Sequence, residues 1–62
     1  MTVYDFVYLC IEPSFMTVEL YSLESGTVWA GPGDEIPEDF LECEICTYDV
    51  PTEANRITLN IE

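Results

Sequence analysis

Three cysteines offer the strongest metal-binding and redox chemistry in this chain. Cys43 and Cys46 form a C-x-x-C pair, and Cys10 lies far upstream. Three thiolates, with a carboxylate or a water as fourth ligand, would complete a tetrahedral zinc site. In a regular strand, positions 43 and 46 point to opposite faces, so joint ligation requires a β-bulge. A redox role is disfavoured because acidic neighbours raise the pKa of a thiol. Two alternatives remain: cysteines that bind nothing, and a zinc-binding interaction module that uses Cys10, Cys43 and Cys46.

A run of carboxylates in the middle of the chain is the second candidate site. Six acidic residues fall within eleven positions: Asp34, Glu35, Glu38, Asp39, Glu42 and Glu44. Their spacing lacks the Asp/Asn ladder, central Gly and terminal Glu of a calcium-binding loop. Carboxylates on a helical turn and a strand can match the spacing of backbone phosphates, and so can occupy a groove lined by Lys and Arg. We expect these six residues to bind a partner. The alternatives are an accessory subunit that is acidic only for solubility, and a specific Ca²⁺ or Mg²⁺ site.

Composition disfavours catalysis and direct contact with nucleic acid. The 62 residues include 13 acidic side chains, one basic side chain and no histidine, which gives a formal net charge of -12. Without histidine or lysine, the common general base, the Schiff-base amine and the triad arrangements cannot be built. We therefore expect a protein that is not an enzyme, has no catalytic residues and requires no cofactor. The charge also exceeds the magnitude of about 2–8 that keeps a small domain soluble, which favours a binding role.

Hydropathy indicates a folded, soluble chain. With 48% hydrophobic and 13% aromatic residues, the composition differs from that of a disordered acidic tail. No stretch approaches the ~20 apolar residues that span a bilayer, and the apolar run at 6–11 lacks the flanks of a signal peptide. An odd number of cysteines argues against a disulfide framework. We expect a single small acidic domain over residues 1–62, in the cytoplasm of a bacterial host, as a monomer or small homo-oligomer.

The first half of the chain predicts a helix followed by a hairpin. Residues 2–11 fit either a helix or a strand; the helix is favoured because Thr2 and Asp5 can form a capping box and Pro13 ends the segment. Residues 15–23 alternate with period two, which predicts a strand with Val18 and Leu20 on one side. Gly26 can adopt a positive φ, so a turn at 24–26 leads into a second strand at 27–30.

The second half predicts a loop, a helical turn and a second hairpin. The loop is the Gly-Pro-Gly sequence at 31–33, and Pro37 is suited to the first turn of a short helix that docks Phe40 and Leu41 on the core. Residues 41–50 alternate again, with Ile45 on one face and the acidic residues and Tyr48 on the other. Residues 51–55 form a polar connection, and 56–61 have the cleanest strand alternation.

Together these elements predict an α+β fold. We expect a small antiparallel sheet of about four strands, arranged as two hairpins, with one N-terminal helix and a short helical turn; the alternative is an all-β domain. Exposed aromatic side chains could add specificity to an electrostatic interface. The candidates are Tyr4, Tyr8, Tyr21, Trp29 and Tyr48. The alternative is that these side chains are buried or half-buried in the core, which is favoured above all for Trp29.

The overall pattern resembles small acidic proteins of phages and mobile elements. It combines the start at residues 2–6, a hairpin, the segment at 36–41, an acidic strand and a final strand at 57–61. Proteins of that kind include anti-CRISPR inhibitors and DNA mimics. The resemblance implies an inhibitor whose acidic face blocks DNA or guide RNA binding by a CRISPR effector nuclease of the Cas9 type. Three cysteines are not part of that pattern, which leaves a zinc-bearing variant open.

Overall fold

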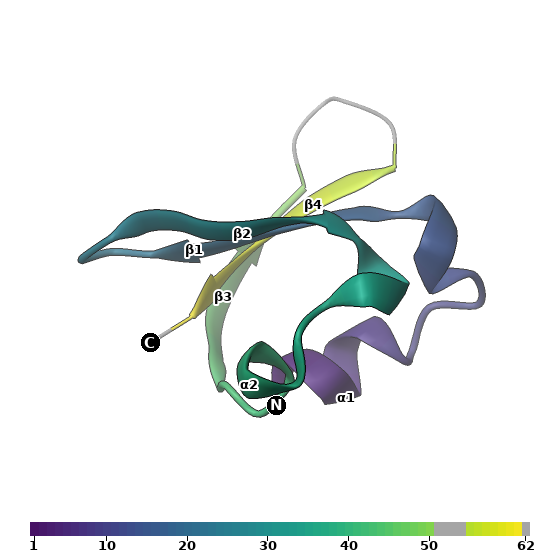
Figure 1. The fold of residues 1–62 in the computed structure, drawn as a ribbon, viewed down its shortest axis with the longest axis horizontal. Coiled ribbons are helices and arrows are strands. Elements are labelled where there is room, and N and C mark those ends of the chain that lie inside the picture. The colour runs from purple at the N-terminus through teal and green to yellow at the C-terminus, as the bar shows by residue number, and fades with distance from the viewer. Residues whose placement is uncertain (51–54, 62) are drawn as a thin grey trace.

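A computed structural model describes residues 1–50 and 55–61 of the chain. These residues form eight elements in sequence: α1 (Val3–Val7), η1 (Pro13–Phe15), β1 (Thr17–Ser22), β2 (Gly26–Pro32), η2 (Gly33–Glu35), α2 (Glu38–Leu41), β3 (Ile45–Asp49) and β4 (Arg56–Ile61). The two α-helices lie on one side of the sheet (Figure 1). The four strands and short helices agree with the α+β prediction and not with the all-β alternative.

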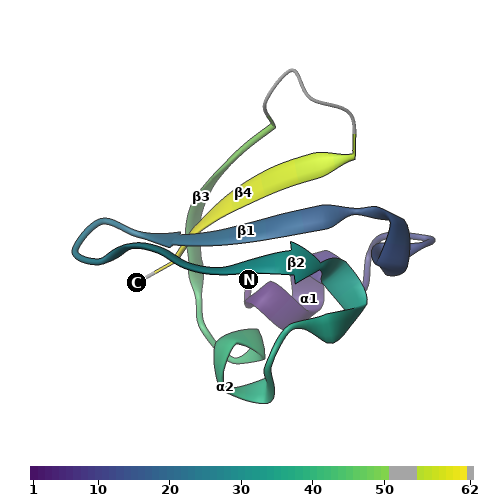
Figure 2. The ribbon, with the colours of Figure 1, turned by 45° about the horizontal axis from the view of Figure 1, so that its top comes forward.

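The sheet is mixed, with strand order β2-β1-β4-β3. β1 pairs with β2 and β3 pairs with β4 in antiparallel fashion, so the two predicted hairpin pairs are confirmed. The prediction of a purely antiparallel sheet is wrong, because β1 and β4 run parallel. Figure 2 shows the connection through η2 and α2, which carries the chain from the β1–β2 hairpin to β3. The period-two pattern of a half-buried strand is the same in parallel and antiparallel pairs, so the sequence could not reveal that β1 and β4 run parallel.

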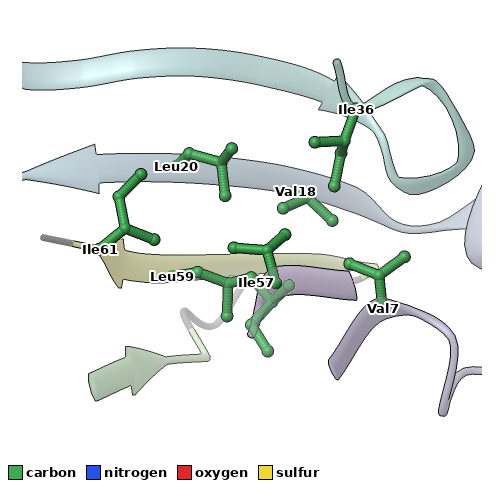
Figure 3. Close-up of a cluster of buried hydrophobic side chains, with 8 residues drawn as sticks. Val7, Val18, Leu20, Ile36, Ile57, Leu59 and Ile61 are labelled. Carbon is green, nitrogen blue, oxygen red and sulfur yellow. The ribbon is translucent and has the colours of Figure 1, made fainter. Parts of the chain in front are cut away.

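The hydrophobic core forms where β1 and β4 meet the helices. Val18 lies opposite Ile57, and Leu20 lies opposite Leu59 in the parallel register. Figure 3 shows these side chains in one layer. Among the residues that the structure describes, the buried hydrophobic ones are Val3, Val7, Val18, Leu20, Ile36, Ile57, Leu59 and Ile61. The two strands with the clearest alternation are therefore central in the sheet, and the weaker strands form its edges.

The N-terminal helix is confirmed but is shorter than predicted. The Thr2 side chain accepts a hydrogen bond from the Asp5 backbone, and the Asp5 carboxylate accepts one from the Thr2 backbone. These reciprocal bonds satisfy two of the free N–H groups at the helix start. The helix ends at Val7 with Tyr8 as its C-cap, so residues 9–11 lie outside it. Val3 and Val7 then face the sheet as one buried ridge.

The turn between β1 and β2 confirms the role of Gly26, which has a φ of 80°. The Gly-Pro-Gly loop prediction is wrong in part, because β2 continues through Gly31 and Pro32. Pro32 can take part in this strand because β2 is at the edge of the sheet. Gly33 starts η2 and is itself buried.

The strand predicted at 41–50 is also shorter, since Leu41 belongs to α2 and β3 begins at Ile45. A register shift between Ile45 and Thr47 marks a bulge, after which Tyr48 lies opposite Leu59. Tyr48 therefore faces the helices, with its ring centroid 5.8 Å from that of Phe6. The predicted placement of Tyr48 on the face opposite Ile45 is wrong, because the bulge inserts one residue.

In the part of the chain that the structure describes, no helix is long and apolar enough to cross a bilayer.

Candidate partner-binding surface

The six predicted partner-binding residues are carried by η2, α2 and the segment that leads into β3. Ile36 separates η2 from α2 and is buried, while Phe40 and Leu41 of α2 pack against the core. These apolar contacts fix the inner side of the segment. Its acidic residues consequently face outward, and all six are exposed: Asp34, Glu35, Glu38, Asp39, Glu42 and Glu44. We call this set the acidic surface.

A hollow of about 510 Å³ lies at the acidic surface, between α2 and the start of α1. Glu38 and Glu42 are four residues apart, at the spacing that places two side chains on one helix face. Both line the hollow together with Leu41, Thr2 and Tyr4. An arginine or lysine side chain fits this chemistry, because its apolar stem can lie along Leu41 and Tyr4 while its charge reaches the carboxylates.

Counter-charges are scarce at the acidic surface. The N-terminal ammonium lies 3.2 Å from the Glu44 carboxylate, and both groups are largely exposed. Such an exposed pair contributes at most about 1 kcal/mol. Among the residues described, none of the other five carboxylates of this surface has a cationic partner within ion-pair distance. The acidic surface therefore keeps nearly its full negative charge.

The tyrosines predicted as candidate anchors are all exposed. Tyr4 and Tyr8 form a ring pair with centroids 4.7 Å apart on the outer side of α1. Tyr21 lies on β1 and Tyr48 on β3. Tyr4 is the member that adjoins the acidic surface, through the hollow it shares with Glu38. Trp29 is half-buried against the core. The aromatic candidates are therefore spread around the molecule, and Tyr4 is the one that the hollow links to the carboxylates.

The three cysteines do not come together. Cys10 follows α1, the Cys43 thiol donates to the Asp39 carbonyl at 3.8 Å, and Cys46 lies exposed at the bulge of β3. None of them is in a disulfide. The described ranges contain no group of three or more Cys, Asp or Glu side chains that could hold a metal ion. The zinc-binding module therefore stays a prediction, and the described residues offer no set of three ligands for it.

Sequence reasoning missed a polar cluster on the uncovered face of the sheet, centred on Glu19. Its carboxylate accepts hydrogen bonds from the Thr27 hydroxyl, from Arg56 at 2.9 Å and from the Thr58 hydroxyl at 3.2 Å. The bond from Thr27, followed by that from Arg56, lowers the pKa of Glu19, and partial burial opposes this shift. The signal in the sequence was the single basic residue, which a chain so rich in acid can place beside a half-buried carboxylate.

Comparisons with protein-family models, with curated proteins and with solved structures found no match to this chain.

Proposed function

We propose that this protein is a non-enzymatic inhibitor that docks its acidic surface on the basic nucleic-acid-binding surface of a larger protein. The observation that carries this proposal is the hollow between Glu38 and Glu42, with Leu41 and Tyr4 in its lining. It combines two carboxylates with apolar contact area, which suits an arginine or lysine that normally contacts a phosphate.

The proposed partner is a CRISPR effector nuclease of the Cas9 type. Such effectors hold a guide RNA–DNA heteroduplex in a positively charged channel and contact its backbone through charge and shape. The acidic surface would occupy part of this channel and exclude DNA or guide RNA. Electrostatic attraction would speed the encounter, and the contact at the hollow would slow dissociation.

The test is binding of the purified protein to a Cas9-type effector at sodium chloride concentrations from low to high ionic strength. We expect affinity to fall steeply with salt and DNA to compete for the effector. The double variant Glu38→Gln, Glu42→Gln should weaken binding at least about tenfold, because each lost charge-assisted hydrogen bond costs about 1.5–3 kcal/mol.

The matched control is Glu12→Gln, Glu24→Gln, which removes the same charge from exposed positions outside the acidic surface. It should change affinity by less than about threefold, since distant exposed charges are screened at ordinary ionic strength. Absence of binding at low salt, or equal loss in both double variants, would contradict the proposal.

A further inference from the structure

A second hollow, of about 540 Å³, lies where α1 and the turn after it approach β3. We call it the β3 groove. The helix side contributes Phe6 and Leu9, and the strand side contributes Ile45, Tyr48 and Val50, with Ile57 also in the lining. It shares no lining residue with the hollow at the acidic surface. The two are therefore separate places on the molecule.

The β3 groove is an opening over the core. Ile57 in its lining is only 6% exposed, whereas Leu9 is 72%, Val50 62% and Tyr48 61% exposed. The bulge in β3 turns Tyr48 to the helix side, where its ring lies beside that of Phe6 in α1 and still leaves most of the Tyr48 side chain exposed. Three large apolar side chains around a buried floor form a patch of the kind that marks an interaction site.

The outer edge of β3 runs beside this groove. Its inner edge pairs with β4, and β3 is the last strand of the sheet order (Figure 2). At its start, the Ile45 backbone N–H donates to the Met1 carbonyl at 2.9 Å. Beyond Ile45, no strand of residues 1–50 or 55–61 pairs with the outer edge. An edge strand next to apolar pockets is the arrangement by which sheets accept an added strand.

Charge indicates what kind of segment would add. The side chains that line the groove are uncharged, and the Met1 ammonium beside it is paired with Glu44. The chain has 13 acidic residues against one basic residue, Arg56, which binds Glu19. A second copy of the chain also carries a net charge of -12, so the two copies repel each other and pairing between their β3 edges is disfavoured. A segment that carries Lys or Arg is attracted instead.

We propose that the β3 groove binds an extended segment of a partner protein that adds to β3 as a strand. Alternate apolar side chains of the segment enter the groove beside Tyr48 and Val50, and flanking Lys or Arg residues lie in the negative field of the chain. This binding site does not rest on the function proposed for the acidic surface.

The experiment is selection of a displayed library of random twelve-residue peptides against the purified protein, followed by titration of the enriched peptides. We expect enrichment of alternating apolar residues with Lys or Arg, and binding with one peptide per chain. In the NMR spectrum of the protein, the largest amide shifts should fall in residues 45–50 and 6–9. No enrichment above background, enrichment without basic residues, or shifts centred on residues 34–42 would overturn the proposal.

Variants separate the groove from general charge effects. Val50→Lys places a cation at the rim of the groove and should lower the affinity of the selected peptides at least about tenfold. Leu23→Lys makes the same change in net charge at an exposed apolar residue of the β1–β2 turn, and should change affinity less than threefold. Amide spectra of both variants verify that the fold is kept. Equal effects of the two variants, or a protein that sediments as a dimer through β3, would also overturn the proposal.

Discussion

Arg56 is the only basic side chain of the protein, and its position shows how a single cation is used within a field of carboxylates. It binds Glu19 on the uncovered face of the sheet, where the Glu19 side chain is 19% exposed. Thr27 and Thr58 complete the hydrogen bonding of this carboxylate from the two neighbouring strands. The cluster therefore ties β2, β1 and β4 together on the side away from the core.

Glu19→Gln should destabilise the protein by about 1–2 kcal/mol at pH 7, since a charged acceptor with several donors is lost. The pKa of Glu19 is lowered from its ordinary value of 4.5, so the unfolded chain binds this proton more tightly than the folded one. The contribution of the carboxylate is thus fully present above about pH 4.5 and is lost as the pH falls through the lower, folded pKa. Urea unfolding of the wild-type protein and of the Glu19→Gln variant, from pH 7 to pH 2.5, measures this contribution to the free energy of unfolding.

Glu24→Gln is the control for the Glu19 prediction. It removes one exposed carboxylate from the β1–β2 turn and relieves the same charge repulsion without loss of a side-chain acceptor for Arg56. The difference in free energy of unfolding between the two variants should be largest at neutral pH and shrink in acid. A difference that stays constant with pH would contradict the assignment to an ionised Glu19.

At the scale of elements, local signals predicted more than pairing signals did. The capping box of Thr2 and Asp5, the positive φ of Gly26 and the bounds of β4 at 56–61 were all predictable, because each depends on neighbours in sequence. The parallel β1–β4 pair and the bulge after Ile45 depend on tertiary contacts, which no local period encodes. For the same reason the exposure of the acidic surface could be predicted, whereas the two hollows could not.

Gly33 lies where η1 and η2 pack so closely that a larger side chain should destabilise the fold. A Cβ there would lie 2.7 Å from the Pro13 carbonyl oxygen, where η1 meets η2. The Gly33 backbone N–H donates to the Met16 carbonyl at 2.9 Å, so the two segments cannot separate freely. We expect Gly33→Ala to destabilise by about 2 kcal/mol in urea unfolding, as overpacked sites do.

Gly31→Ala is the matched comparison for Gly33. Its added Cβ would lie 3.0 Å from the Trp29 ring, which is a half-buried side chain that can shift, and not from backbone. The cost should therefore stay below about 1 kcal/mol. An equal or reversed order of the two variants would show that the contact between η1 and η2 is not a fixed constraint.

For the whole molecule, net charge opposes folding. The carboxylates repel one another, and the described residues hold two ion pairs against them. A small domain of this size has few buried contacts in reserve. The six exposed carboxylates of the acidic surface therefore lower stability, a cost that the proposed binding role would explain.

This cost can be measured through salt. Raising sodium chloride from 0.02 to 0.5 M should stabilise the protein by about 1 kcal/mol, or roughly 4–8 °C in Tm, because ions screen the repulsion. Neutralising all six residues of the acidic surface to Asn or Gln changes the formal charge from -12 to -6, since six of the 13 acidic residues are removed. That variant should be more stable at low salt and respond less to added salt. If salt lowers stability, or if the variant is the less stable protein at low salt, then the acidic surface stabilises the fold and its charge does not oppose folding.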